Sequence, residues 1–205
     1  MSNPPPISDD PALVIVAGPN GSGKSSAYGN AKLDWEERTI WINNPDLLTL
    51  RLQKAENLDK LSANLEAVNR IERWLYASID VHQTIGVETV LSTGKYRKLV
   101  EHAKARGFES WLIYVVLDSE ERNIERVKIR ANSGGHDVPV EKIRERYWRS
   151  IQQFPWSLDK ADRAWVYDNS DAEPKLIARK EAGRISVEPD ALEVVINAVK
   201  TIQSA

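Results

Sequence analysis

The stretch LVIVAGPNGSGKSSA, residues 13–27, constrains the fold of this chain more than any other. Apolar residues run up to Gly18, and glycines, a lysine and serines follow almost at once. Residues 18–25 match the pattern G-x-x-x-x-G-K-[ST] in full. In this pattern the glycines let the backbone curl, so that successive N–H groups face phosphate oxygens. The helix that follows adds its positive N-terminal end. The stretch therefore predicts a strand, a phosphate-binding loop and a helix in direct succession.

The chemistry expected of this loop is nucleotide binding. Lys24 is expected to reach the terminal phosphates of ATP or GTP, and the Ser25 hydroxyl is expected to bind Mg²⁺. Ser26 is expected to be a neighbour of these groups more than a ligand. A glycine-rich turn that binds nothing is the alternative, and the apolar run before the loop argues against it. The predicted nucleotide-binding residues are Gly18, Pro19, Asn20, Gly21, Ser22, Gly23, Lys24, Ser25 and Ser26.

Composition narrows the class of protein further. The 205 residues fit one sizeable domain, and a net charge of −2 gives no electrostatic footprint for bulk nucleic acid or an anionic membrane. The chain has no cysteine, which excludes disulfides and thiol catalysis and fits a cytoplasmic protein. Its 3 histidines share no metal-ligand spacing. Residues 1–11 lack the pattern of a signal peptide, and their proline-rich sequence is expected to form a flexible tail.

Strand and helix patterns alternate along the chain, which predicts crossovers and a mostly parallel sheet. We expect an α/β fold of the P-loop NTPase or kinase type: a doubly wound, five-stranded sheet with helices on both faces, followed by a hairpin and a helix, all in one domain over 12–205. Strands are expected at 12–18, 39–44, 86–93, 110–118 and 163–170. Helices are expected at 22–32, 45–55, 62–83, 95–107, 119–131 and 140–154, the hairpin at 176–188 and the last helix at 190–203. Ligands of such sheets bind beyond the carboxyl ends of the strands.

Other nucleotide-dependent classes lack their usual motifs here. Motor ATPases usually follow an apolar strand with Asp-Glu, and the nearest match is VVLDSEE, where Asp118 is interpreted as a helix cap. The guanine-reading N-K-x-D of GTPases is absent. Small kinases instead need an acidic residue near the acceptor hydroxyl and arginines on a lid. Both occur in this sequence.

The acidic candidate is Asp46, in the segment Asn43-Asn44-Pro45-Asp46 after the second strand. A carboxylate there could accept the acceptor's hydroxyl proton, although it could equally stabilise the first turn of the following helix. The third strand adds Glu88, which would be costly to bury in an apolar sheet without a partner. A polar residue on a strand edge is the other interpretation. The expected acceptor-binding residues are Asn44, Asp46, Glu88, Thr89 and Thr93.

The arginines lie in residues 122–150, on both sides of Gly134-Gly135. Such a flexible break between two arginine-bearing helices is typical of a closing lid. The alternative is a pair of solvated helices held by ion pairs. His136, at the pivot, could contact phosphate or serve as a structural hydrogen bonder. The arginines expected to act on the transferring group, together with Lys24 and Asp46, are Arg126, Arg130 and Arg144.

Taken in order, the motifs AGPNGSGKSS, NNPD, VETVLST, GGHDVPVEKIRERYWRS and VYDNS resemble the zeta toxin family of P-loop kinases, in its compact stand-alone bacterial form. The resemblance covers about residues 12–170. It implies a kinase with ATP or GTP as donor and a nucleotide sugar, UDP-N-acetylglucosamine, as acceptor. It also implies membership of a toxin–antitoxin pair, with an antitoxin protein as partner.

Carried over by position, the resemblance gives Lys24 and Ser25 the phosphate and Mg²⁺ roles, Asp46 the role of catalytic base and Glu88 that of the substrate-strand acid. Its lid arginines leave the choice among Arg126, Arg130 and Arg144 open. Tyr167, Asp168 and Asn169 fall on the turn that passes the adenine. Two other classes stay open: a nucleotide-binding regulatory protein that acts through a partner, and a kinase acting on a nucleic-acid end.

Overall fold

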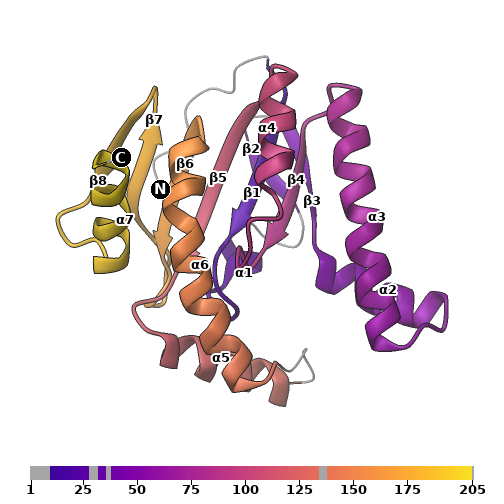
Figure 1. The fold of residues 1–205 in the computed structure, drawn as a ribbon. Helices are drawn as coiled ribbons and strands as arrows, with labels where there is room; N and C mark the ends of the chain where they lie inside the picture. The colour runs from indigo at the N-terminus through magenta and orange to yellow at the C-terminus, as the bar shows by residue number, and fades with distance from the viewer. Residues whose placement is uncertain (1–9, 28–31, 36–37, 134–137, 205) are drawn as a thin grey trace.

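The computed structural model describes residues 10–27, 32–35, 38–133 and 138–204. Its strands form one 8-stranded sheet in the order β2-β3-β4-β1-β5-β6-β7-β8 (Figure 1). Strands β3, β4, β1, β5 and β6 run parallel, which confirms the expected parallel core, and the antiparallel β2, β7 and β8 extend it at both edges. The strands are β1 (Ala12–Ala17), β2 (Lys32–Trp35), β3 (Arg38–Asn43), β4 (Ile85–Thr89), β5 (Glu109–Val116), β6 (Arg163–Asp168), β7 (Lys175–Glu181) and β8 (Arg184–Val187).

Strand β1 lies between β4 and β5, and all of its residues are buried, as its continuous apolar sequence predicts. In the register with β4, Val16 lies opposite Glu88 and Ala17 opposite Thr89. Because parallel strands end at the same edge of a sheet, the loop that follows β1 begins beside the end of β4. The sheet thus places the glycine-rich loop next to the polar residues of the third predicted strand.

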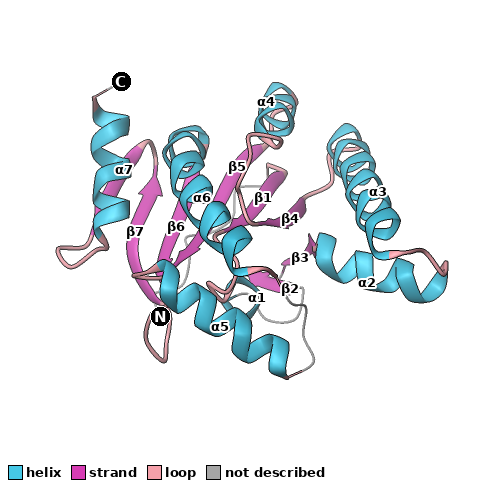
Figure 2. Ribbon diagram, turned by 60° about the horizontal axis from the view of Figure 1, so that its bottom comes forward, coloured by secondary structure: helices cyan, strands magenta, loops and turns pink. Residues whose placement is uncertain are grey.

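The helices are α1 (Lys24–Ala27), α2 (Pro45–Ala55), α3 (Lys60–Asp80), α4 (Arg97–Ala105), α5 (Glu120–Asn132), α6 (Val140–Lys160) and α7 (Glu193–Gln203). Helices α3, α4, α6 and α7 lie on one face of the sheet (Figures 1 and 2) and share a core cluster with inward residues of the strands, such as Leu13, Ile15 and Tyr114. The alternate strand residues, including Val14 and Trp111, form a second cluster on the opposite face. Within the described residues this second cluster is made of strand residues alone.

The long helix α3 does not bury the face that the spacing of its large apolar residues predicts. Leu65, Val68, Ile71 and Leu75 follow one another at three or four residues, a spacing that predicts one buried helix face, yet Leu65 is 61% exposed. Ala63 and Ala67 are buried instead, in a small cluster with Leu52 of α2. The close approach of α2 to α3 requires small side chains at the contact, and this decides which stripe of the first turns faces inward.

Two boundaries depart from the expected pattern. Residues 32–35 form β2, an edge strand paired with β3. The sequence pattern instead predicts that the helix after the loop continues to residue 32. Helix α6 continues through Pro155 to Lys160, although the prediction ends it at 154. Proline costs the helix one backbone hydrogen bond. Burial of Phe154 and Leu158, each 0% exposed, holds this last part of the helix on the sheet.

The C-terminal part matches its prediction closely. Strands β7 and β8 form a hairpin that turns at Ala182 and Gly183, with φ values of 48° and 75°, and α7 follows. Such positive values suit a tight turn between twisted strands. The hairpin pairs with β6 and so extends the sheet. None of the helices in the described parts of the chain is long and apolar enough to span a membrane.

Candidate functional site

The glycines of the loop after β1 adopt backbone conformations that suit a phosphate cradle. Gly18, Gly21 and Gly23 have φ values of 144°, 79° and 88°. A Cβ at Gly18 would lie 2.0 Å from the carbonyl oxygen of Val115, and one at Gly21 would lie 2.5 Å from that of Asn123. The loop is therefore packed against the end of β5 and the start of α5, and only glycine fits at these points.

Lys24, the first residue of α1, is buried over the loop. Its Nζ donates hydrogen bonds to the carbonyl oxygens of Gly18, at 2.7 Å, and Pro19, at 2.9 Å. Burial lowers the pKa of Lys24 from its ordinary value, while the carboxylates of Glu88 and Asp46 raise it. Both acidic residues that the sequence assigns to the acceptor side thus act on the charge of this lysine. Anionic phosphates beside it would favour its charged form.

Glu88, at the end of β4, connects the loop to the acceptor side. Its Oε2 accepts hydrogen bonds from Ser25 Oγ, at 3.1 Å, and from Asn44 Nδ2, at 2.8 Å. Asn44 also caps α2, because its Oδ1 accepts from the backbone N–H of Leu47 at 3.1 Å. The half-buried carboxylate is therefore satisfied, and one side chain ties the start of α1 to the start of α2.

Asp46 lies in the first turn of α2, at the wall between two hollows. The inner hollow, of about 210 Å³, reaches to the end of β4 and is lined by Asn44, Asp46, Glu88, Thr89, Thr93 and Arg146, with neighbours from α3 and the loop after β4. Thr89 Oγ1 accepts a hydrogen bond from the backbone N–H of Leu91 at 3.0 Å. All of the expected acceptor-binding residues thus line one cavity.

The outer hollow, of about 380 Å³, lies between α2, α3 and the start of α6. Asp46 and Arg146 line both hollows, so the two are adjacent. The outer hollow is otherwise lined by Thr49, Leu50, Gln53, Lys60, Leu61, Asn64, Val138, Pro139 and Lys142. The residue patterns give no separate signal for this second space, because its walls come from elements far apart in the chain.

The predicted lid arginines lie in different places. Arg126 lies beside the loop: its Nη2 is 3.3 Å from the carbonyl oxygen of Ser170, and its Nη1 is 3.9 Å from a Cβ built on Gly23. Arg130 is close enough to Lys24 to lower the pKa of its ammonium. Arg144 is remote from this group, since it pairs with Glu120 at 3.3 Å and lines a groove between α5 and α6. Arg146, which the sequence does not single out, lines the same two hollows as Asp46.

Two asparagine side chains outside the loop donate hydrogen bonds to its backbone carbonyl groups. Asn123 Nδ2 donates to the carbonyl oxygen of Asn20 at 2.6 Å, and Asn169 Nδ2 donates to that of Ser22 at 2.8 Å. The resemblance places Asn169 at the adenine, whereas its amide here is bonded to the phosphate loop. Only the turn context of YDNS could have indicated Asn169, and nothing in the helical pattern of α5 indicates Asn123.

The other residues predicted from the sequence either lie near the phosphate loop or belong to the part of the chain that the structure does not describe. The interpretation of Asp118 as a helix cap is wrong, because Ser119 is the N-cap of α5 and the Asp118 carboxylate accepts instead from the Arg122 side chain, at 2.8 Å, and from Ser119 Oγ, at 3.0 Å. Asp168 accepts from the Ser170 backbone at 2.9 Å and so stabilises the turn after β6. The expected pivot Gly134-Gly135 and His136 lie outside the described residues.

Comparison with known proteins gives a family match over most of the chain. The AAA domain family (AAA_33) matches residues 13–152, which span β1, the loop, both hollows and most of α6. The chain belongs to this family. A protein of Haemophilus influenzae, described as uncharacterized, is 26% identical over 142 residues, which cover 65% of this chain and 91% of that protein.

Three solved structures, two of them of one complex, share the fold at low sequence identity. A chain of the AvrRxo1-ORF1:AvrRxo1-ORF2 complex with sulphate ions superposes with a TM-score of 0.70 at 17% identity, over 94% of this chain and 64% of that one. The same complex with ATP gives a TM-score of 0.68. The PezAT toxin-antitoxin system of Streptococcus pneumoniae gives a TM-score of 0.60 at 14% identity, over 96% of this chain and 85% of that one. This chain thus spans about two thirds of the AvrRxo1 chain, and it shares the fold of these chains.

Proposed function

We propose that the protein is an ATP- or GTP-dependent kinase that transfers the γ-phosphoryl group to a hydroxyl of a small molecule. The observation that carries this is the contact of Glu88 with both Ser25 and Asn44, since this one carboxylate joins the end of the loop to the hollow that Asp46 also lines. The influence of Asp46 and Glu88 on the pKa of Lys24 supports the same closeness.

The transfer follows from the positions of these groups. The backbone N–H groups of the loop hold the donor phosphates, and Lys24 leaves its carbonyl partners to neutralise them. Asp46 accepts the proton of the acceptor hydroxyl as the hydroxyl oxygen forms a bond to the γ-phosphorus. The bond from that phosphorus to the β,γ-bridging oxygen breaks, and the nucleoside diphosphate leaves. Arg126 and Arg130 lie where they can stabilise charge on the transferring group.

The oxygen atoms beside the loop fit Mg²⁺. Ser25 Oγ and Glu88 Oε2 lie 3.1 Å apart at the mouth of the loop. Magnesium in such enzymes takes one or two protein oxygens and completes its shell with waters and phosphate oxygens. Ser25 would hold the ion, with Glu88 beside it, and the ion would supply positive charge to the donor phosphates.

The finer assignment rests on the resemblance to zeta toxins and on the likeness to PezAT. We propose a nucleotide sugar such as UDP-N-acetylglucosamine as the acceptor, and a toxin–antitoxin pair as the setting, with an antitoxin as partner. The hydroxyls and carboxylates of the inner hollow suit a polyhydroxylated acceptor. Growth arrest on expression of the wild type, absent with Asp46→Asn, is the result expected of a toxin.

The test of the kinase is γ-phosphate transfer to a panel of nucleotide sugars, sugars and 5′-hydroxyl oligonucleotides. Asp46→Asn is expected to lower kcat by roughly 10²- to 10⁴-fold, the usual contribution of general acid–base catalysis, with nucleotide affinity unchanged. Asp118→Asn is the matched control, since this carboxylate follows β5 but bonds Arg122. Equal ATP consumption by wild type and Asp46→Asn, with no labelled acceptor, would leave a nucleotide-binding regulatory protein as the better description.

A further inference from the structure

Asn44, the residue before α2, contacts two groups of opposite hydrogen-bonding character. Its Oδ1 accepts from the backbone N–H of Leu47 at 3.1 Å, and its Nδ2 donates to Glu88 Oε2 at 2.8 Å. The first contact needs an acceptor and the second needs a donor, so the two together fix the orientation of the amide. Aspartate caps a helix as well as asparagine does, but an ionised aspartate has no hydrogen to donate to Glu88. The asparagine therefore meets a requirement beyond helix capping.

The first turn of α2 connects Asn44 closely to Asp46. Pro45 lies between them, and its ring fixes the backbone φ angle at the start of the helix. The carbonyl oxygen of Asn44 accepts from the backbone N–H of Leu48 at 3.1 Å. The carbonyl oxygen of Pro45 accepts from Thr49 Oγ1 at 2.8 Å. Because Asp46 lies within this bonded turn, the position of its carboxylate depends on how firmly Asn44 is held.

The carboxylate that holds Asn44 also contacts the phosphate loop. Ser25 Oγ, the expected ligand of Mg²⁺, donates at 3.1 Å to the same Oε2 atom of Glu88. A hydroxyl whose oxygen lies on a divalent cation is a stronger hydrogen-bond donor, because the cation makes its hydrogen more acidic. The positive charge also attracts the nearby carboxylate. Glu88 should therefore be held more firmly once Ser25 is occupied by Mg²⁺ and nucleotide, and Asn44 with it.

We propose that Asn44 is a positioning residue that couples the phosphate loop, through Glu88, to the placement of Asp46. When Mg²⁺ and nucleotide occupy the loop, the first turn of α2 becomes more ordered and presents Asp46 to the acceptor. This rests on the proposed kinase function and adds an order to it, donor before acceptor. It also changes the role of Asn44, which the sequence assigns to acceptor binding, because its Oδ1 and one of its N–H groups are already bonded within the protein.

Hydrogen exchange of single backbone amides, followed by NMR on the whole chain, tests the coupling without an acceptor. The amide of Leu47 reports the cap directly, since it is bonded to Asn44 Oδ1. A saturating non-hydrolysable ATP analogue with Mg²⁺ is expected to slow its exchange by at least about 3-fold, in keeping with the strength of one hydrogen bond. The same analogue in EDTA should slow it less. The amide of Leu61 is the internal control, because Asp59 caps α3 in the same way and bonds the first turn of its own helix.

An exchange of one asparagine separates the coupling from the cap. Asn44→Asp keeps a capping oxygen for Leu47 but has no donor for Glu88, so the variant is expected to lose the nucleotide-dependent slowing. Asn43→Asp is the matched control, since this neighbouring asparagine donates to the carbonyl oxygen of Gly86 at 3.1 Å, and it should keep the slowing. The comparisons made on the wild type do not depend on the folding of either variant.

Equal slowing of the Leu47 and Leu61 amides, or equal slowing with and without Mg²⁺, overturns the coupling. A response that persists in Asn44→Asp overturns it as well. In transfer assays with UDP-N-acetylglucosamine, Asn44→Asp should lower kcat by roughly 10- to 100-fold with little change in the KM for the acceptor, whereas loss of an acceptor-binding residue would raise that KM.

The two kinds of measurement separate this proposal from the proposed function. A nucleotide-dependent response of the Leu47 amide without any phosphorylated acceptor supports the coupling and contradicts the kinase. A phosphorylated acceptor without that response supports the kinase and overturns the coupling.

Discussion

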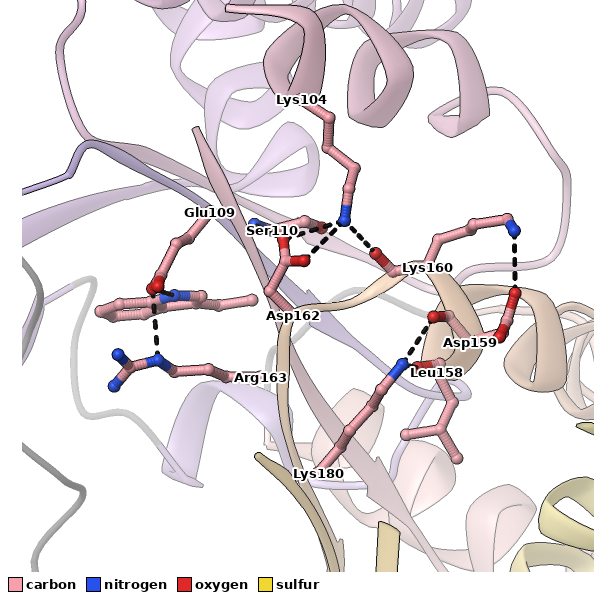
Figure 3. Close-up of polar contacts among 10 residues, drawn as sticks. Lys104, Glu109, Ser110, Leu158, Asp159, Lys160, Asp162, Arg163 and Lys180 are labelled. Carbon is pink, nitrogen blue, oxygen red and sulfur yellow. Dashed lines mark hydrogen bonds and ion pairs between the residues drawn. The ribbon is translucent and has the colours of Figure 1, made fainter. Parts of the chain in front are cut away.

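The two ends of the sheet both carry charged side chains but use them differently. At the amino end, Lys104 donates to Asp162 at 2.7 Å and to the carbonyl oxygen of Lys160, while Lys180 donates to the carbonyl oxygens of Leu158 and Asp159 (Figure 3). These lysines bond the last carbonyl groups of α6, as is typical of helix C-termini. A hollow of about 730 Å³ lies there, larger than either hollow at the carboxyl end.

Each charged side chain of that larger hollow has a partner within the protein. Glu109 pairs with Arg163 at 3.2 Å, and Asp159 pairs with Lys160 at 2.9 Å (Figure 3). At the carboxyl end, by contrast, Arg146 has no ion-pair partner in the described ranges. Size alone therefore does not locate the site. Charges that are already satisfied hold the fold together, whereas charges drawn from water without a partner indicate a ligand.

Substitution of a glycine is expected to have the largest effect, and the effect should differ between the two ends of the sheet. Gly18 and Gly183 both have positive φ, 144° and 75°, but a Cβ at Gly18 would meet the carbonyl oxygen of Val115 at 2.0 Å and one at Gly183 would meet nothing within 4 Å. Gly18→Ala is expected to lower nucleotide affinity by about 100-fold or more, because several charge-assisted hydrogen bonds to phosphate are lost together. Fluorescence titration with a nucleotide analogue measures this.

Gly183→Ala is the control for that change, and it should lower stability by roughly 1–2 kcal/mol through its left-handed backbone alone, with nucleotide affinity intact. Similar nucleotide affinities for the two variants would remove the distinction between a turn that shapes the hairpin and a loop that binds phosphate.

Lys180→Met tests the structural character of the amino end. Lys180 is 8% exposed, and its loss leaves two carbonyl groups at the end of α6 without their donor. We expect the free energy of unfolding to fall by about 1–3 kcal/mol, and the melting temperature to fall by roughly 2–4 °C per kcal/mol. Transfer activity per folded molecule should stay at the wild-type level.

Lys160→Met, which removes an exposed ion pair in the same region, should leave the melting temperature nearly unchanged. A loss of activity in Lys180→Met without loss of stability would assign this end a functional role that its saturated contacts do not indicate.

A smaller effect is expected from the asparagine that holds the phosphate loop. Asn169→Ala removes the hydrogen bond to the carbonyl oxygen of Ser22 at 2.8 Å and leaves that carbonyl without this donor. A buried hydrogen bond of this kind contributes about 1 kcal/mol, so the KM for ATP should rise roughly 5- to 10-fold. The KM for the acceptor should change little, because Asn169 does not line either hollow. An equal rise in both constants would point to general disorder of the site.

The smallest expected effect is the uptake of a proton by Lys24 when nucleotide binds. Burial lowers the pKa of Lys24 in the free protein from its ordinary 10.5, and donor phosphates should raise it again. At alkaline pH below 10.5, nucleotide binding is therefore expected to take up a fraction of a proton. Calorimetry in buffers of different ionisation enthalpy measures the uptake. Lys24→Arg, whose side chain stays protonated, should bind without it, and equal uptake by both proteins would assign the proton to another group.

Much of the fold was predictable because its signals are local. The apolar run of β1, the proline at the start of α2 and the turn at Ala182-Gly183 each act within a few residues. Edge strand β2 and the continuation of α6 through Pro155 were not predictable from such signals. Both depend on packing against distant elements, β3 in one case and the sheet face under Phe154 in the other. The long-range contact of Leu52 with two alanines of α3 likewise overrode the leucine spacing of that helix.

The sequence by itself determined the phosphate loop, since strand, glycines, lysine and helix are contiguous and need no partner to be recognised. It also marked Asp46 and Glu88, because residues after parallel strands meet at one edge of the sheet. Only the tertiary structure decided which arginine of α6 faces them. Residues two apart lie about 200° apart around a helix, so Arg144 and Arg146 point to nearly opposite sides. The contact of α6 with distant elements placed Arg146 in the lining of the two hollows that Asp46 also lines, and it left Arg144 paired with Glu120.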